Sequence, residues 1–218
     1  MSQLVAESTQ TPFSQFLRTA TSEVHDRAHG SAYMTELLAG RLRVDEYALL
    51  AAQLYFVYSA LEAAGDALAD DPVARPFVID ELRRVPGLVA DLEFLVGSDW
   101  ESRIEALPAT RRYTARLREV AQSWPGGYVA HHYTRYLGDL AGGQVVRSVL
   151  QRSYGISGAG SLFYDFAHVG NPAAFRRRYR AALDSAPFDA QERERVRDET
   201  LRAFEYNIAV LEELDAAL

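Results

Sequence analysis

Three glycines lie within six residues of a segment that otherwise favours a helix. The segment is "YTRYLGDLAGGQVV", residues 133–146, and the glycines are Gly138, Gly142 and Gly143. Each glycine inside a helix costs about 0.5–1 kcal/mol relative to alanine, so the bare backbone needs a reason. One reason is close packing of another helix against Gly138 and Gly142, which are four residues apart. The other reason is a flat ligand that lies directly against the helix backbone.

Polar side chains beside these glycines could hold ordered water. Arg135 and Asp139 are four residues apart and therefore share one face of a helix. A solvated ion pair is the ordinary meaning of this spacing, and such a pair contributes little stability. Together with the phenols of Tyr133 and Tyr136 on the same stretch and of Tyr55 and Tyr58 on the long helix, however, these groups could line an apolar cavity and deliver protons to a buried reaction centre. The spacing alone leaves both interpretations open.

The five histidines are the remaining candidates for chemistry, and they are His25, His29, His131, His132 and His168. His25 and His29 are one helical turn apart beside an apolar stripe, a spacing that can chelate a metal ion. The chain lacks the HExxH motif of zinc enzymes and the paired ExxH motif of helical di-iron proteins. We expect His131 and His132 to be partly exposed, and His168 to lie in a loop without a role.

The composition is that of a soluble globular domain and excludes several kinds of site. The 218 residues are 48% hydrophobic and 24% charged, which suits one domain with a substantial core. The net charge of -7 argues against nucleic acid as a partner. Because the chain has no cysteine, it has no disulfide, iron–sulfur cluster or cysteine nucleophile. We recognise neither a signal peptide nor a membrane span, and therefore expect a cytoplasmic protein without a membrane partner.

Helical periodicity dominates the chain, strand signals are nearly absent, and we expect a single all-α domain of about eight helices. We expect residues 1–11 to be disordered and residues 12–218 to form the domain. The predicted helices span about 12–29, 32–39, 44–69, 78–95, 110–122, 127–154, 172–184 and 189–217.

Local signals mark several of these helix ends. Thr11 and Pro12 predict a helix start, with a capping hydroxyl followed by proline at the first helical position. Gly30 predicts the end of that helix. Asp189 with Glu192 predicts a capping box for the last helix.

Five segments, in order along the chain, resemble the haem oxygenase family. They are "TSEVHDRAHGSAYM" (21–34), "LYFVYSALE" (54–62), "YTRYLGDLAGGQVV" (133–146), "FRRRYRAALDS" (175–185) and "FEYNIAVLEEL" (204–214). The resemblance extends over nearly the whole chain. It implies a multi-helix fold that holds haem between a proximal and a distal helix. It also implies oxidative ring opening of haem b to biliverdin, iron and CO, with haem as substrate and cofactor and with O₂ and external electrons consumed.

The resemblance assigns the two walls of the haem site. His25 is similar to the family's proximal iron ligand. Gly138, Gly142 and Gly143 are similar to the bent distal helix that lies over the haem face, which would explain the glycines. The chain departs from the family at His29, where relatives often carry a glutamate able to polarise the proximal imidazole. Because a partner of this kind tunes a metal-bound histidine, the resemblance leaves the electronic properties of the iron open.

The resemblance also assigns the catalytic and haem-binding side chains around these walls. Asp139 is similar to the anchor of a distal water network, with Tyr58 and Arg135 as its partners. The positions similar to those that bind the haem propionates are Arg18, Tyr133, Arg176 and Arg180, and Phe204 is similar to a residue of the pocket wall. Guanidinium groups suit carboxylates because their planar fork can donate two parallel hydrogen bonds.

Two alternatives and the partners follow from the same reasoning. A haem carrier or storage protein without turnover would need the propionate contacts but no water network. A non-haem di-iron oxygenase would need carboxylate and histidine ligands that the sequence does not supply in the required motifs. We expect a monomer that receives electrons from a ferredoxin or a flavoprotein reductase. A local basic patch could form from Arg111, Arg112, Arg116 and Arg118.

Overall fold

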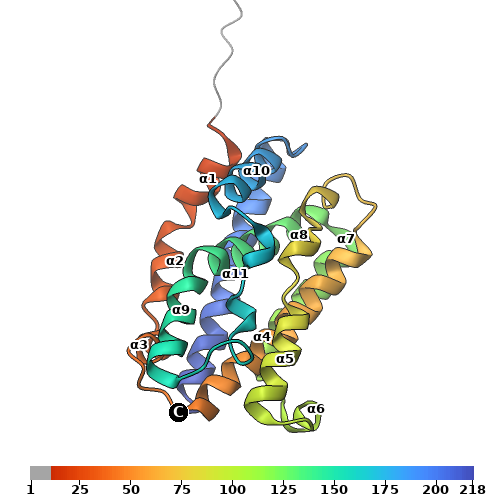
Figure 1. Ribbon diagram of the computed structural model, residues 1–218. Coiled ribbons are helices and arrows are strands. Elements are labelled where there is room, and N and C mark those ends of the chain that lie inside the picture. The colour runs from red at the N-terminus through yellow and green to blue at the C-terminus, as the bar shows by residue number, and fades with distance from the viewer. Residues whose placement is uncertain (1–10) are drawn as a thin grey trace, which may run out of the picture.

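The computed structural model describes residues 11–218, and the regular elements in this range are all helical (Figure 1). The all-α prediction is confirmed. Except for Thr11, the segment predicted to be disordered lies outside the described residues. The α-helices are α1 (Phe13–Ala20), α2 (Ser22–His29), α3 (Ala32–Leu38), α4 (Val44–Ala67), α5 (Val85–Val96), α6 (Trp100–Arg103), α7 (Pro108–Ser123), α8 (Pro125–His132), α9 (Gly138–Tyr154), α10 (Pro172–Asp184) and α11 (Ala190–Asp215). Short 3-10 turns occupy η1 (Arg75–Phe77), η2 (Asp80–Leu82), η4 (Leu162–Tyr164) and η5 (Ala167–Val169).

The first predicted helix is two helices in the structure. The helix is interrupted at Thr21, whose hydroxyl donates to the Leu17 carbonyl oxygen, one turn earlier, at 2.8 Å. Such a bond offers the backbone an alternative to continuing the helix. The predicted cap is also wrong, because α1 begins at Phe13 after Pro12 and no side chain caps it.

The predicted helix 78–95 is helical only in its second part, as α5. Pro86 lies in the first turn of α5, where its missing N–H costs nothing, and the residues before it cannot continue a helix through it. The short helix α6 was not predicted.

The capping residues predicted for the last helix are confirmed in part. Asp189 caps α11 as predicted, since its carboxylate accepts the Glu192 backbone N–H at 2.8 Å. The Glu192 carboxylate instead accepts hydrogen bonds from Trp124 at 2.5 Å and Arg195 at 2.7 Å, so the predicted capping box is half formed. Gly155 ends α9 in the left-handed conformation, with φ of 68°.

The glycine-rich helix runs continuously from α8 into α9, but its hydrogen-bond pattern changes in between. Residues Tyr133–Leu137 (η3) form one π-helical turn. The Thr134 hydroxyl donates to the Ala130 carbonyl oxygen at 2.9 Å, and bonding to the carbonyl four residues earlier often bends a helix. π-Turns occur frequently at functional sites. The irregularity therefore lies immediately before Gly138, a feature that the sequence pattern did not predict.

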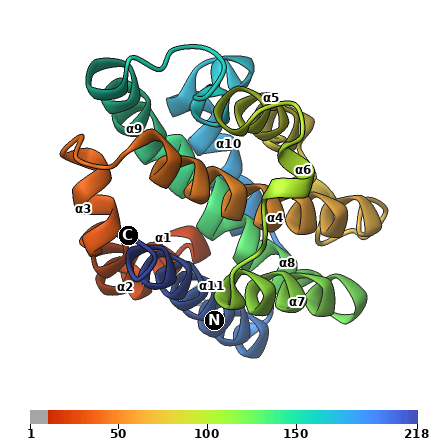
Figure 2. The ribbon, with the colours of Figure 1, turned by 90° about the horizontal axis from the view of Figure 1, so that it is seen from below.

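Helix α4 crosses the middle of the fold, and α11 lies along one side of the molecule between α2 and α7 (Figure 2). Helix α4 packs against α5 and α7, and α11 packs against α2, α3, α7 and α8. Among the helices of residues 11–218, α4 alone is long and apolar enough to cross a membrane, but 67% of its apolar window is buried inside the protein. Helix α4 is therefore the core helix of this fold.

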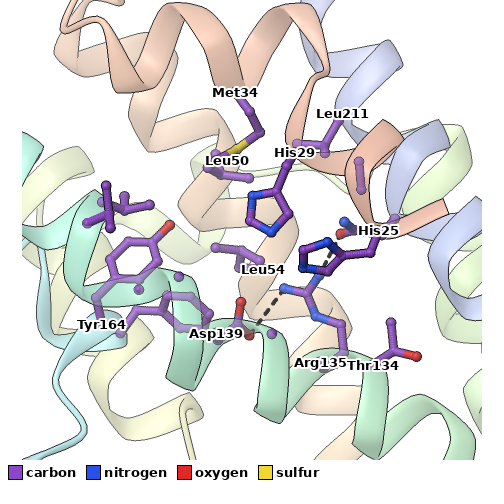
Figure 3. A pocket seen from close by; sticks show the side chains of 18 of the residues that line it. His25, His29, Met34, Leu50, Leu54, Thr134, Arg135, Asp139, Tyr164 and Leu211 are labelled. Carbon is purple, nitrogen blue, oxygen red and sulfur yellow. Dashed lines mark hydrogen bonds and ion pairs between the residues drawn. The ribbon is translucent and has the colours of Figure 1, made fainter. Parts of the chain in front are cut away.

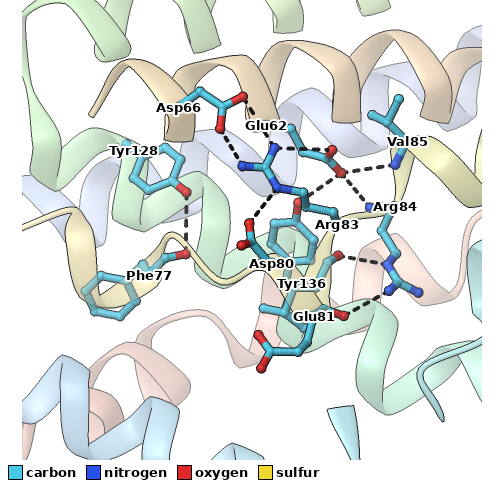
Figure 4. Close-up of polar contacts among 11 residues, drawn as sticks. Glu62, Asp66, Phe77, Asp80, Glu81, Arg83, Arg84, Val85, Tyr128 and Tyr136 are labelled. Atoms are coloured by element: carbon cyan, nitrogen blue, oxygen red, sulfur yellow. Dashed lines mark hydrogen bonds and ion pairs between the residues drawn. The ribbon is translucent and has the colours of Figure 1, made fainter. Parts of the chain in front are cut away.

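A polar cluster joins three segments that are distant in sequence (Figure 4). The Glu62 carboxylate on α4 accepts the backbone N–H groups of Arg84 and Val85, and Tyr136 of η3 lies 3.5 Å from it. The Arg84 guanidinium is buried and donates to the carbonyl oxygens of Glu81, Leu82, Phe163 and Asp165. Because buried carbonyl groups need partners, this arginine fixes the loop after α9 against the start of α5.

The expectation that His131 and His132 are partly exposed is wrong. Their relative exposures are 0% and 2%, because α8 lies between other helices of the core. The His131 ring bonds to the Glu199 carboxylate at 2.9 Å, and the His132 ring bonds to the Tyr179 hydroxyl at 2.8 Å. Both histidines are therefore structural residues of the core.

Because His132 is buried, we expect the folded protein to lose stability at acidic pH. Burial lowers the pKa of His132 to about 3. The unfolded chain takes up a proton at this residue below about pH 6.5, and the folded chain does not until much lower pH. The folded state therefore loses stability as the pH falls from 6.5 towards 3. Between pH 7 and pH 5, His132 should account for about 2 kcal/mol of lost unfolding free energy.

Urea unfolding of the wild type and of His132→Gln at both pH values measures this contribution. The variant should be less stable at pH 7, because its packing against Tyr179 is altered, but its stability should fall less between pH 7 and pH 5. An equal loss in both proteins would mean that His132 does not titrate in this way.

Candidate functional site

A large pocket opens between α2 and α9, with α4 and α11 at its sides (Figure 3). The space between its walls is about 1000 Å³ when the open mouth is included. Most of its wall is apolar, from residues such as Leu50, Leu54 and Leu211. The polar side chains that line it are His25, His29, Thr134, Arg135, Asp139 and Asn207. An apolar cavity with few converging polar groups is the usual form of a cofactor or substrate site.

The three predicted glycines all line this pocket, on the wall formed by α9. A Cβ atom at Gly138 would meet no other atom within 4 Å, and one at Gly142 would meet only the His29 ring, at 3.5 Å. No helix packs against these two glycines, so close helix packing does not explain them. At Gly143 a Cβ atom would lie 3.1 Å from Tyr164, so that glycine accommodates the loop after α9. The open backbone at Gly138 and Gly142 leaves room for a flat ligand.

Helix α2 supplies two imidazoles to the opposite wall. The ring centres of His25 and His29 are 4.4 Å apart and their planes are tilted by 47°. The His25 Nδ1 atom lies 3.2 Å from the Asp26 carboxylate, which leaves Nε2 free for a metal when Nδ1 carries the proton. The Phe204 ring stands edge-on to His25 at 6.2 Å and forms part of the wall, as predicted. Burial, and then the neighbouring His25, lower the pKa of His29, so His29 is neutral at physiological pH.

The structure brings together the three residues predicted to form a polar network. The Tyr58 hydroxyl donates to the Asp139 carboxylate, and an Arg135 guanidinium nitrogen lies 3.5 Å from the same carboxylate. Arg135 also donates to the Asn207 amide oxygen at 2.5 Å. The Arg135 and Asp139 side chains are only 8% and 18% exposed, so the interpretation as a solvated ion pair is wrong.

Burial determines the electrostatics of this network. Burial raises the pKa of Asp139 well above its usual value and lowers the pKa of Arg135. Among the described residues, the buried side-chain atoms without a hydrogen-bond partner are Ser59 Oγ, Thr110 Oγ1, the Tyr113 hydroxyl, His131 Nδ1 and Arg135 Nε, and of these residues Arg135 lines the pocket. Buried polar atoms without protein partners are typical positions for internal water. The site thus combines a carboxyl group of raised proton affinity with places where water can bind.

The predicted propionate-binding residues lie outside the enclosed pocket. Burial raises the pKa of the Tyr133 phenol, while a hydrogen bond with Thr21 and the charges of Arg180 and Arg18 oppose that rise. These side chains therefore lie close together, where α1, η3 and α10 meet. Arg176 is one turn before Arg180 on α10. Within residues 11–218, none of these three arginines forms an ion pair with a carboxylate, so their charges remain free for an anionic ligand.

Asn207 and Tyr164 are among the pocket residues that were not predicted. Asn207, which binds Arg135, lies three residues after Phe204 on α11, so helical spacing could have placed both on one face. Tyr164 reaches Gly143 from the loop after α9, and no local pattern indicates that contact. Within residues 11–218, no group of three or more His, Cys, Asp or Glu side chains is arranged to hold a metal ion, and a di-iron site has no ligand set there.

Comparisons with known proteins agree with this geometry. The family model described as "Heme oxygenase" matches residues 11–213. "Heme oxygenase 2" of Rattus norvegicus is 38% identical over 207 residues, which cover 94% of this chain and 66% of the rat protein. The chain thus spans slightly less than two thirds of the length of that relative.

Solved structures are similar over almost the whole fold. The crystal structure of heme oxygenase-1 from the cyanobacterium Synechocystis sp. in complex with heme has a TM-score of 0.90 at 35% identity, and covers 94% of this chain and 93% of that one. The structure of heme oxygenase from Leptospira interrogans has a TM-score of 0.88 at 32% identity, and the match covers 93% of this chain and 99% of that one.

The empty space beside Gly138 predicts opposite effects of one substitution on stability and on binding. Gly138→Ala should stabilise the ligand-free protein by about 0.5–1 kcal/mol, because alanine favours the helix and its methyl group meets nothing. The same methyl group should weaken hemin binding by about 1–3 kcal/mol, because it occupies space needed by the ligand. Urea unfolding and hemin titration measure the two effects.

Ser148→Ala is the matched control, because Ser148 lies on an exposed part of the same helix and outside the pocket. Its hemin affinity should equal that of the wild type. If Gly138→Ala also bound hemin with wild-type affinity, the ligand would not lie against this part of α9.

Proposed function

Because the chain belongs to the haem oxygenase family, we propose that it catalyses the oxidative ring opening of haem b to biliverdin, iron and CO. The reaction consumes O₂ and electrons from an external donor. One observation carries the proposal beyond family membership. His25 on α2 faces the wall formed by α9, which carries no side chains at Gly138 and Gly142. The Tyr58–Asp139–Arg135 network lies beside that wall.

The residues present fit a haem. A planar macrocycle needs a slot between two walls, and Cβ atoms at Gly138 and Gly142 would reduce this slot. The iron needs a nitrogen ligand, which His25 would supply through Nε2 while Asp26 accepts the proton on Nδ1. When bound, the haem supplies an iron that activates O₂ and a porphyrin carbon that is oxidised.

Asp139 is proposed to deliver protons through water. Its carboxyl group is buried against Tyr58 and Arg135, and burial raises its pKa. A proton donor must carry its proton at the working pH, and a raised pKa favours the protonated form of this carboxyl group. The Arg135 Nε atom without a partner offers a further position for the water that would carry the proton.

Arg18, Tyr133, Arg176 and Arg180 are proposed to bind the propionates. Their free charges lie beyond one end of the pocket, so a haem anchored there would extend its apolar part between α2 and α9. The positions of these contacts would set the rotation of the macrocycle in its plane. They would therefore decide which meso carbon lies beneath the network.

The electron donor is proposed to be a ferredoxin or a flavoprotein reductase, and the protein is proposed to act as a cytoplasmic monomer. The patch of Arg111, Arg112, Arg116 and Arg118 is a poor docking surface for an acidic donor. Three of its arginines are paired with carboxylates, those of Glu105 at 3.2 Å, Glu213 at 3.3 Å and Glu199 at 2.8 Å.

A haem carrier is the alternative, and one observation weighs against it. A carrier needs the imidazole and the propionate contacts, but it does not need a buried carboxyl group beside the ligand. Burying Asp139 and Arg135 carries a desolvation cost that ligand binding alone does not explain.

Single turnover of the hemin complex tests the proposal. With a reductant, air and catalase, the wild type should lose its Soret absorbance and form biliverdin, which chromatography identifies. Asp139→Asn should bind hemin as the wild type does but form biliverdin at least about 100-fold more slowly, because proton delivery typically contributes that factor or more. Biliverdin formation at the wild-type rate by Asp139→Asn would contradict the role of this carboxyl group. A wild-type complex that never opens its ring would favour the carrier.

His25→Ala tests the iron ligand separately. We expect the variant to retain hemin in the pocket, because the propionate and apolar contacts remain, but its visible spectrum should lose the features of a histidine-ligated iron. Free imidazole should restore them by occupying the space left by the side chain. A variant spectrum identical to that of the wild type would assign the iron to His29 instead.

A further inference from the structure

The second imidazole of α2 has no task in the proposed reaction. His29 lines the same pocket as His25, and its Cε1 atom lies 3.5 Å from the position that a Cβ atom of Gly142 would occupy. The ring thus reaches from α2 towards the wall formed by α9 (Figure 3). A macrocycle between the two walls would need this space, so the His29 ring would have to turn aside when a haem binds.

The two imidazoles are arranged for shared metal binding. They are one turn apart on α2, their ring centres are 4.4 Å apart, and both face the pocket. Imidazole nitrogens bind divalent transition metals at about 2.0–2.1 Å, so two rings on one ion stand a few ångströms apart, as these do. Histidines four residues apart on a helix are a common chelating pair.

We propose that His25 and His29 form a two-imidazole site for a divalent transition-metal ion in the haem-free pocket, and that this site holds the ferrous ion released by ring opening. The second part rests on the proposed function, whereas the first part does not. An intact macrocycle occupies the equatorial positions of its iron and leaves His29 no position to bind. Once the ring is opened and the bonds between the ferrous ion and the product nitrogens break, those positions would be free, and an ion already beside His25 could bind His29 as well.

The site is built for temporary binding. Within the described residues, no third His, Cys, Asp or Glu side chain completes it, so water or product must fill the remaining positions. Asp26 contacts His25 through Nδ1 and orients that ring without entering the pocket lining. Two neutral nitrogen ligands suit first-row divalent ions, with affinity rising from Fe²⁺ through Ni²⁺ to Cu²⁺.

Calorimetric titration of the tag-free, haem-free protein with NiCl₂ tests the metal site without any turnover. The wild type should bind one Ni²⁺ per chain. His29→Gln and His25→Gln should each weaken binding at least tenfold, because each leaves a single imidazole. His168→Gln is the matched control, since His168 is exposed and outside the pocket, and it should bind Ni²⁺ as the wild type does. Equal Ni²⁺ affinity of the wild type and His29→Gln would overturn the proposal.

Competition places the ion in the pocket. With Ni²⁺ at ten times its dissociation constant, the apparent hemin affinity of the wild type should fall about tenfold, as mass action requires for exclusive sites. The hemin affinity of His29→Gln should change little at the same Ni²⁺ concentration. Unchanged hemin affinity of the wild type would place the Ni²⁺ elsewhere and reject the site.

Trapping of iron by ferrozine after a single turnover tests the second part. Iron should reach the chelator more slowly from the wild type than from His29→Gln, while both form biliverdin. Equal rates would reject the retention of iron by His29 and leave the Ni²⁺ result standing. If no biliverdin formed in either protein, the proposed function would fail, and the titration would still decide whether the two-histidine site exists.

Discussion

The site depends on one constraint. Helix α9 must line the pocket without side chains at Gly138 and Gly142, two positions at which a helix would otherwise use side chains for packing. A helix normally gains its place from the side chains it buries, and Gly138 and Gly142 bury none. Other contacts must therefore hold α9. On one side η3 brings Tyr136 towards Glu62, and on the other Gly143 fits against Tyr164. Arg84 connects the two regions, because its backbone N–H donates to Glu62 and its guanidinium donates to the carbonyl oxygens of Phe163 and Asp165.

The same arrangement explains the electrostatics of the network. Asp139 and Arg135 are one turn apart on a backbone that is already held, so they stay buried although burial opposes the charge of both. Tyr58 comes from α4, the core helix, and Asn207 comes from α11. The two longest helices thus each contribute one hydrogen bond that orients the polar side of the pocket. Burying these polar groups lowers the stability of the folded protein but fixes their arrangement, as is common where a protein performs chemistry.

The sequence allowed much of this to be predicted, for reasons that differ between residues. Helical periodicity and the glycine spacing are local features of the sequence. The all-α fold and the unusual glycine-rich helix could therefore be predicted from the sequence alone. The roles of His25, Phe204 and the propionate-binding arginines came from resemblance, because no local rule distinguishes an iron ligand from a structural histidine. The burial of His131 and His132 could not be read, because it depends on Glu199 and Tyr179 from distant helices. The π-turn was missed because it depends on how α8 and α9 are anchored on either side of Thr134.

That π-turn has an evolutionary consequence. A π-turn accommodates one residue more than the same length of α-helix, and each residue of an α-helix advances the direction of the side chains by about 100°. Deleting a single codon within Tyr133–Leu137 would convert the π-turn into a regular helical turn, whereas deleting a codon from the regular part of α8 would rotate every later residue of α9 by about 100°. Asp139 and the glycines would then leave the pocket together. A one-residue change of length between α8 and α9 is therefore compatible with the site at Tyr133–Leu137, where the π-turn takes up the difference, and not in the regular helix on either side.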